Sequence, residues 1–522
     1  MLRDVVGNYL DTLSEREFDG PLLALLSARK FSDVHFIHGA FEFGKDVVAK
    51  RADPTTGEVR QYVIQSKAGD IGVPEWRAVR SQLEECEYNT LGHPSFDATL
   101  PRVVVLVTTG RLKGGAPADV SEYRRSVAVR DLADLEIWDK SDIIDWICAD
   151  PLIGVAGDPT RSTALMSMLT NVLDNGVSER RLEKNTRSWL PSEGGDVRRA
   201  SIEAAILING LLRVRRLDLA LSVGLQLVRS AAAEPQALPQ FDKAALTLVL
   251  DLATRILDQV EPLFGDPLAI ARRTIARLGQ LTYPVICNRL AEAIAIGFLI
   301  ASASNHDVLA SRFRGALIEL AEQPGASRPP SDLFGASVLL VGVALSAIDR
   351  PAAVRYLRRV AQWVLDRHDD DLAGLGLASL SEDEQATAER LFGGSLESTT
   401  VERRTSSYLA TVVLDLTLVL DDQALYEALL DNFRALRIVA ETTNADEVTA
   451  HWVRGGAVVW PVPNVQFEQW YAQSTKAETL SVEPLLAMLL TAACRSRHYR
   501  STWSAVTALA EGPVNPRART SG

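Results

Sequence analysis

Residues 61–67 read QYVIQSK and residues 102–109 read RVVVLVTT, and these two stretches decide the fold of the N-terminal part. The first is rich in the β-branched and aromatic residues of strands, and a turn at 52–57 separates it from DVVAK at 46–50, so the pair predicts a β-hairpin. The second is a continuous apolar run, which is typical of a strand covered on both faces. Together they predict a mixed sheet.

The surrounding sequence supplies helices to cover this sheet. Apolar residues at helical spacing predict helices within 5–30 and at 74–88, 118–125 and 142–148, and short apolar runs predict further strands at 34–38 and 135–138. This order of elements predicts one α/β domain over residues 1–155, with a central mixed sheet flanked by helices.

The longer remainder of the chain differs in composition and in the spacing of its apolar residues. From about residue 160 it is rich in Leu and Ala, almost entirely helical in period, and without a clean repeat of fixed length. We therefore expect a large all-α domain at 160–511, built as a helical array. A mixed stretch at 442–463 predicts an ordered loop or a broken helix, and 512–522 predicts a disordered tail. The clearest helices are expected at 200–230, 244–259, 268–300, 307–322, 352–367, 406–420 and 482–493.

Composition excludes several classes of protein. The 522 residues include 55 Lys and Arg against 67 Asp and Glu, a net charge of −12, which excludes a protein that permanently coats nucleic acid. Four scattered Cys, none in C-x-x-C spacing, exclude a disulfide scaffold and a zinc ribbon. The longest apolar stretches, 291–302 and 333–348, are shorter than the ~18–20 residues that span a bilayer. With no apolar leader visible, we expect a cytoplasmic protein without a membrane partner.

Three polar residues of the predicted hairpin carry chemistry. Asp46 begins one strand, and Gln65 and Lys67 lie two apart on the next, so that these two share a face. A carboxylate, an amide oxygen and an ammonium brought together in this way suit metal-assisted cleavage of a phosphodiester, because Mg²⁺ prefers oxygen ligands. Taken alone, the three residues fit equally well the polar side chains that any solvated hairpin carries.

The region as a whole resembles the Mrr-like restriction endonuclease family, which has the PD-(D/E)xK nuclease fold. The resemblance covers about the first 150 residues, and its motifs occur in the family's order. An opening helix, a G-K-D before a strand, a Q-x-K strand and an apolar strand ending in T-T-G carry it, followed by a small-residue loop and a last strand and helix. These are Phe18-Asp19 with Leu25-Leu26 and Lys30-Phe31, Gly44-Lys45-Asp46, Gln65-Ser66-Lys67, Val103 to Gly110, Gly114-Gly115-Ala116, and Leu135 to Ile147.

This resemblance implies a Mg²⁺- or Mn²⁺-dependent endonuclease that acts on DNA. It places metal ligands at Asp46 and Gln65 and a catalytic lysine at Lys67. Its fold would be the restriction-endonuclease-like arrangement of a sheet between helices, here followed by the helical array.

The resemblance also implies an acidic helper on the first helix. Asp19 fits the family's register, with Asp in place of Glu, and Glu17 or Glu15 could serve instead. Glu42, in the loop before Asp46, is an alternative ligand that is more often simply solvated.

A local excess of basic residues surrounds the predicted site, although the chain as a whole is acidic. We expect four of them to contact DNA: Lys45, Lys50, Arg77 and Arg80.

These expectations combine into one interpretation with open alternatives. The leading interpretation is an endonuclease of bacterial restriction or anti-phage defence, whose helical half senses a trigger or a protein partner and assembles a homo-oligomer. The first alternative is a non-catalytic module that binds nucleic acid or protein on the same fold. The second is a nuclease that acts on RNA or branched DNA.

Overall fold

The computed structural model describes most of the chain and divides it into two compact units. One unit comprises Met1–Arg215 with Glu234–Ala245, and the other comprises Arg216–Ala233 with Leu246–Gly522. The described residues are 2–37, 46–53, 56–88, 95–149, 159–174, 176–234, 239–266, 268–278, 282–379, 382, 384–392, 401–442, 458–459, 483–495 and 503–511.

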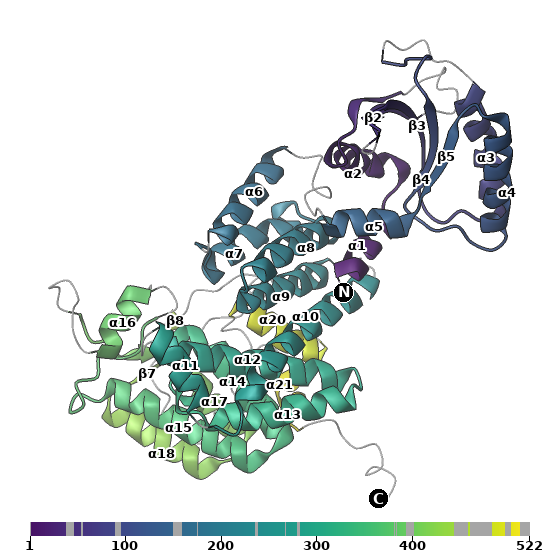
Figure 1. Cartoon of the computed structure of the whole chain (residues 1–522). Helices are drawn as coiled ribbons and strands as arrows, with labels where there is room; N and C mark the ends of the chain where they lie inside the picture. The colour runs from purple at the N-terminus through teal and green to yellow at the C-terminus, as the bar shows by residue number, and fades with distance from the viewer. Residues whose placement is uncertain are drawn as a thin grey trace, which may run out of the picture. The chain divides into compact units, whose positions relative to one another are not determined.

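The first unit is built on a five-stranded mixed sheet in the order β1-β2-β3-β4-β5 (Figure 1). The first three strands are antiparallel, and β3, β4 and β5 run parallel. The predicted hairpin and the predicted apolar strand at 102–109 are therefore both confirmed, as is a mixed sheet flanked by helices. The strands are β1 Ser32–Phe36, β2 Val47–Ala52, β3 Val59–Lys67, β4 Arg102–Thr108 and β5 Asp134–Trp138.

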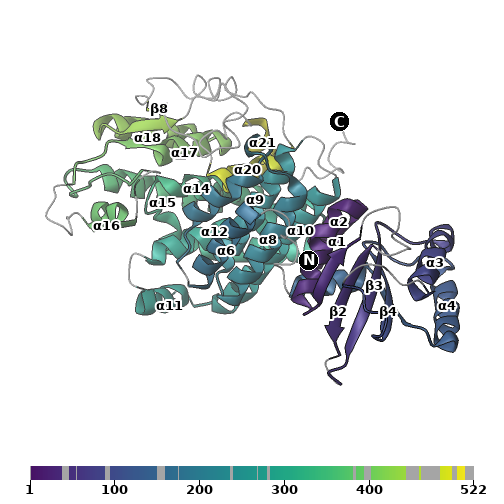
Figure 2. The same ribbon diagram turned by 90° about the horizontal axis from the view of Figure 1, so that it is seen from above.

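Helices cover both faces of this sheet (Figures 1 and 2). On one face, α3 (Val73–Tyr88) and α4 (Ala116–Arg130) share a core with the strands. Trp76, Val79 and Leu83 of α3 follow the three- and four-residue spacing of one helix face, and all three are buried in that core. The other face carries α1 (Leu2–Asp11), α2 (Glu15–Ala28) and α5 (Lys140–Ala149).

The single helical segment expected within 5–30 is in fact two helices, α1 and α2. The break comes at Ser14, whose hydroxyl accepts from the backbone N–H of Glu17 while the Glu17 carboxylate accepts from the backbone N–H of Ser14. This reciprocal capping box satisfies donors that a helix start otherwise leaves unpaired. The capping box therefore starts a new helix at a point where the spacing of apolar residues alone does not indicate a break.

Three further helices belong to the first unit: α6 (Pro159–Leu173), α7 (Glu179–Thr186) and α8 (Val197–Arg213). Helix α8 packs along α1, and α1 in turn packs along α5. The first compact unit thus continues past residues 155–160, where the composition of the sequence changes.

The second unit is largely helical, with one long apolar helix inside it. Helix α12 (Thr282–Ala303) has 22 residues, so it is longer than the apolar stretch predicted from the sequence and passes the length and hydropathy test for a membrane span. However, 72% of its apolar window is buried inside the molecule, as in a core helix. Helix α14 (Gly335–Ile348) is likewise buried along most of its length.

Two expectations for the helical part of the chain need correction. Long helices predicted at 200–230 and 268–300 are each divided in two, the first at Arg215, whose φ of +60° is incompatible with a continuing helix. A small sheet of β6, β7 and β8 also interrupts the helical pattern, with strands of two to four residues. Most of 443–463 and all of 512–522 lie outside the described residues.

The remaining elements of the second unit are α9 Leu217–Ala233, α10 Pro239–Val260 (whose first residues belong to the first unit), α11 Ala269–Leu278, α13 Asp307–Glu322, α15 Arg350–His368, α16 Glu384–Phe392, β6 Ser406–Ser407, α17 Tyr408–Val419, α18 Gln423–Ala435, β7 Val439–Thr442, β8 Val458–Val459, α20 Pro484–Cys494 and α21 Trp503–Ala510.

Candidate functional site

The site begins where the β2–β3 ladder ends. Val47 pairs with Ile64 and Val48 with Val63, so continuing the register by one step places Asp46 opposite Gln65. The two side chains meet there, because the Gln65 amide nitrogen donates to Asp46 Oδ2 at 2.5 Å. The predicted pair is therefore brought together by the register of the hairpin.

The Asp46 carboxylate also closes the ladder. Its Oδ2 accepts the backbone N–H of Ser66 at 2.7 Å, next to the bond from Gln65. The carboxylate thus lies at the open end of the hairpin, held by two donors and half-buried rather than free in solvent.

Gln65 is the less usual member of the pair, because it is 2% exposed and its carbonyl oxygen Oε1 is buried without a hydrogen-bond donor among the residues that the structure describes. A buried polar atom without a partner costs about 1–3 kcal/mol. Such atoms in a native structure call for an explanation such as a water or an ion. The position therefore suits an oxygen ligand for a cation.

Lys67 ends β3 and faces the first turn of α2. Its ammonium lies 3.2 Å from the Glu15 carboxylate, and the lysine side chain remains 26% exposed. The pair is partly open to solvent, so the ammonium is held in place and can still meet a second anion. Glu15 is thus the acid of the first helices that the structure brings to the lysine.

The other two acids of α2 lie in different situations. Asp19 is four residues after Glu15, so both project from one side of the helix, and Asp19 is half-buried. Glu17 belongs to the capping box at Ser14 and ion-pairs with Arg198 of α8 at 3.5 Å. The Ser14 N–H and hydroxyl lower the pKa of Glu17, so this carboxylate is engaged in fixing the helix start.

A set of hydrogen bonds fixes the backbone just after Lys67. The Thr108 hydroxyl donates to the Gly69 carbonyl at 2.6 Å, and the Gly69 N–H donates to the Thr109 hydroxyl at 2.9 Å. A side chain at Gly110 would collide with the backbone of Gly69 and Asp70. The T-T-G sequence at the end of β4 therefore locks the end of β3, and with it the position of Lys67.

The predicted DNA-contacting residues are spread over several settings. Lys50 ion-pairs with Asp33 at 2.7 Å, and this lysine, followed by His35, lowers the pKa of Asp33 to about 2. Arg77 and Arg80 are exposed on α3, where Arg80 pairs with Glu84 at 3.0 Å and stacks over Tyr123. Two further predicted residues, Lys45 and the alternative ligand Glu42, lie outside the described residues.

The side chains present can hold a hard divalent cation only with help from water or backbone. Within the described residues there is no group of three or more His, Cys, Asp or Glu side chains placed to bind a metal. Asp46 and Gln65 together offer one charged and one neutral oxygen. Mg²⁺ commonly keeps several of its waters and takes one or two protein carboxylates, so this donor set fits Mg²⁺ or Mn²⁺ and does not fit zinc.

Sequence reasoning missed the roles of Glu15 and of the two threonines. Glu15 stood only among the alternatives to Asp19, which fits the family's register. Its contact with Lys67 could not be read from the sequence, because it joins the start of one helix to the end of a strand 52 residues later. The two threonines entered the sequence analysis only as part of the family's T-T-G motif. The signal that could have revealed their role was a pair of hydroxyl residues followed by a glycine at the end of a strand.

Comparisons with protein-family models, with curated proteins and with solved structures found no match to this chain. The interpretation of the site therefore depends on its residues and their geometry.

Proposed function

We propose that the chain is a metal-dependent DNA endonuclease and that the end of the β2–β3 hairpin is its active site. The observation that carries this proposal is the buried Gln65 Oε1, without a donor in the described part of the chain, beside the Asp46 carboxylate, with the Lys67 ammonium two residues further along β3. An acid, an amide oxygen and an ammonium in this arrangement suit phosphodiester hydrolysis with a hard cation.

Each residue has a distinct task in the proposed site. Asp46 and Gln65 would hold Mg²⁺ or Mn²⁺, which supplies charge neutralisation and a more acidic water when it is bound. Lys67 offsets the charge that grows on the phosphate, because a positioned cation stabilises the transition state more than the substrate. Glu15 positions the lysine, and Asp19 lies on the same side of α2.

The substrate and setting follow from charge and from the need to cut two strands. The net charge of −12 disfavours lasting contact with duplex DNA, so we propose that recruitment or assembly raises the local concentration. One site cuts one strand, so a double-strand break needs two copies. We assign this assembly, and the sensing of a trigger or protein partner, to the helical part, in a role in bacterial restriction or anti-phage defence.

The direct test incubates the full-length protein with supercoiled plasmid in Mg²⁺, in Mn²⁺, in zinc and in chelator. Nicking or linearisation is expected with the first two metals only. Light scattering on the same sample reports whether the active species is an oligomer. Absence of cleavage at every oligomeric state would favour the non-catalytic binding module.

A parallel panel of substrates separates the two nuclease alternatives. Duplex DNA, a four-way junction and single-stranded RNA are offered at equal nucleotide concentration under the same metal. Faster hydrolysis of RNA or of the junction than of duplex DNA would keep the site assignment and change the substrate.

A further inference from the structure

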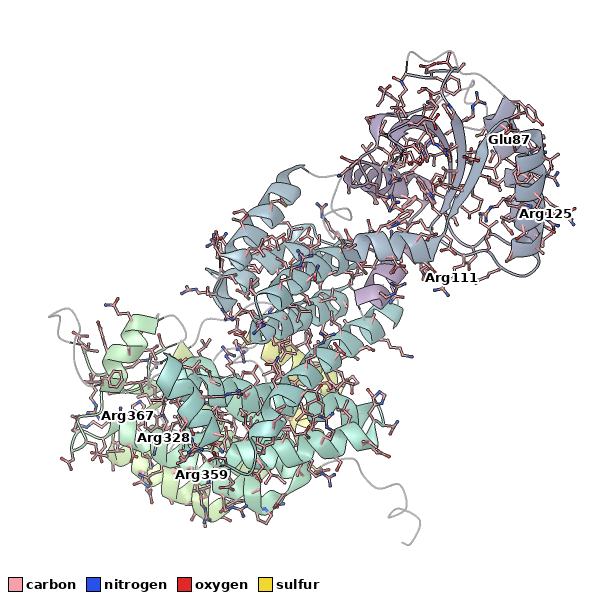
Figure 3. All side chains as sticks on the ribbon, in the orientation of Figure 1. Glu87, Arg111, Arg125, Arg328, Arg359 and Arg367 are labelled. Carbon is pink, nitrogen blue, oxygen red and sulfur yellow. The ribbon has the colours of Figure 1, made fainter. Side chains whose placement is uncertain are left out.

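A tryptophan on the surface of the second unit is flanked by two arginines that form no ion pair with any residue in the described part of the chain. Trp363 lies on α15, half-buried, and its indole N–H donates to the Pro329 carbonyl at 2.9 Å. The guanidinium carbon of Arg367 is 5.0 Å from the centre of the indole ring, and that of Arg328 is 5.8 Å from it. Figure 3 labels both arginines beside this part of the helix.

The sequence of α15 builds this feature as a stripe. Arg355, Arg359, Trp363 and Arg367 recur every four residues, so they follow one another along one side of the helix. Glu322 compensates the first two, at 3.5 Å from Arg355 and 2.5 Å from Arg359. The uncompensated part of the stripe is therefore the part around Trp363.

The two flanking arginines differ from the ion-paired arginines of the same unit. Arg312, for example, meets Glu261 at 2.6 Å and Asp258 at 2.7 Å. Over the part of the chain that the structure describes, no carboxylate lies within ion-pairing distance of Arg328 or Arg367, and Asp366 acts on Arg367 only from further away. Two guanidinium groups without a direct ion pair therefore lie beside one indole ring.

Arg367 also has hydrogen-bonding capacity that the protein leaves unused. One of its terminal nitrogens donates to the Leu391 carbonyl at 3.0 Å, but its Nε is buried without an acceptor among the described residues. Burial lowers the pKa of Arg367, and the charge of the neighbouring Asp366 opposes this effect only in part. Arg328 is exposed and its guanidinium is free to turn toward a ligand.

We propose that the Trp363 cluster, formed by Trp363, Arg328 and Arg367, is a binding site for a phosphate-bearing nucleotide. A guanidinium fork matches the oxygens of phosphate, and an indole or a guanidinium plane stacks on a base. An acidic peptide would satisfy the charge but would make no use of the ring. The nucleotide can be a free one or part of a single strand, since the chemistry is the same. This inference is independent of the nuclease proposal.

The test measures binding by the full-length protein in chelator, so that no strand is cut. One probe is ATP, and the other is a fluorescent oligothymidylate of about twelve nucleotides, within the ~4–16 nucleotides that one single-strand binding site covers. Arg328→Glu is expected to weaken binding about tenfold or more and to reduce the salt dependence. Trp363→Leu is expected to weaken it as well.

Arg314→Glu is the matched control, because Arg314 of α13 is also exposed and has no ion pair among the residues that the structure describes. It makes the same change in net charge and is expected to alter binding less than about twofold, which is general screening rather than contact. Thermal melting of all three variants checks that they fold.

The outcomes distinguish a free nucleotide from a single strand as the ligand, and they can overturn the proposal. If ATP binds and displaces the oligonucleotide, the cluster is assigned to a free nucleotide. If the oligonucleotide binds and ATP does not compete with it, the cluster is assigned to a single strand. Equal losses in Arg328→Glu and Arg314→Glu, or no binding of either probe by the wild type, would refute the cluster.

Discussion

The two ends of the β2–β3 hairpin place similar polar residues in different environments. At one end, Arg60 meets Asp134 of β5 at 2.8 Å, and this aspartate is 69% exposed. At the other end, the Asp46–Gln65 pair is withdrawn from solvent and leaves one buried oxygen without a donor. The same strands thus carry a partly exposed ion pair at one end and a buried carboxylate–amide pair at the other. Among the described residues, Arg60 Nε and Gln61 Nε2 near the first end are also buried without a partner, but both are nitrogens, whereas Gln65 Oε1 is an oxygen beside a carboxylate. An oxygen pair of this kind suits a cation, and surface ion pairs contribute little, so we place function at the second end.

The largest expected difference between the two ends is in activity. Lys67→Ala removes the ammonium beside the proposed site and should lower the rate of plasmid nicking by about 10²-fold or more. Arg60→Ala removes a cation of the same strand at the other end and should leave the rate within about twofold. Initial rates on supercoiled plasmid in Mg²⁺ measure both. Equal rates in the two variants would mean that the ends are not functionally different.

Stability should also distinguish the two ends through their glycines. Gly110→Ala puts a methyl group into the backbone of Gly69 and Asp70, so we expect a loss of about 2 kcal/mol or more in the free energy of unfolding. Gly57, in the turn at the other end, has a φ of +74° and open space around it, so Gly57→Ala should cost only about 1 kcal/mol. Urea unfolding compares them, and a Gly110→Ala variant as stable as Gly57→Ala would contradict the close packing.

Mg²⁺ should restore the stability that an added carboxylate costs at only one end of the hairpin. Gln65→Glu sets a second carboxylate against Asp46, which raises the pKa of the pair in the folded state. The folded protein then keeps a proton above about pH 4, where the unfolded chain has already lost it, so the fold loses stability as the pH rises past this value. We expect a cost of about 1–2 kcal/mol at pH 8 in chelator. Mg²⁺ should restore the melting temperature and preserve cleavage.

Gln61→Glu is the control for this charge. Gln61 is also buried on β3, and its side-chain oxygen accepts the backbone N–H of Asp97. This variant should lose stability in chelator without recovery in Mg²⁺. Recovery in both variants, or in neither, would argue against a metal at Gln65.

The smallest effect is expected from Lys50, one of the basic residues around the predicted site. Lys50 is the first cause of the low pKa of Asp33, about 2, so their pairing stabilises the fold above the unfolded pKa of roughly 4 and is lost as the pH falls toward 2. Lys50→Ala should therefore reduce stability at pH 5 by less than about 1 kcal/mol, because both groups are partly exposed. The difference should shrink below pH 4 in urea titrations. A difference that grows toward acid pH would contradict this pairing.

Much of the first unit follows from local sequence. The strand at 102–108 could be predicted because an unbroken run of Val and Leu between a turn and a glycine has few other stable forms. The pairing of Asp46 with Gln65 followed because a short hairpin fixes its own register. Both predictions used contacts between residues that are close along the chain.

What could not be predicted depends on packing between distant segments. Glu15 reaches Lys67 only because α2 lies across the end of β3, and α8 extends the first unit only because it packs along α1. The strands β6 to β8 escaped notice because two to four residues show no alternation to read. In the helical part, Glu322 pairs with Arg359 but not with Arg367. This difference likewise depends on how α13 packs against α15.

The most direct test titrates Mn²⁺ into the wild type, Asp46→Asn and Asp134→Asn, and follows bound Mn²⁺ by paramagnetic resonance and nicked plasmid in the same samples. Asp46 belongs to the proposed site, and Asp134 is the matched aspartate at the other end of the sheet. The wild type and Asp134→Asn should bind Mn²⁺ and nick plasmid over the same range of metal concentration, and Asp46→Asn should do neither. Nicking by Asp46→Asn at the wild-type rate, or Mn²⁺ binding that is equal in all three proteins, would contradict the assignment of the hairpin end as the active site.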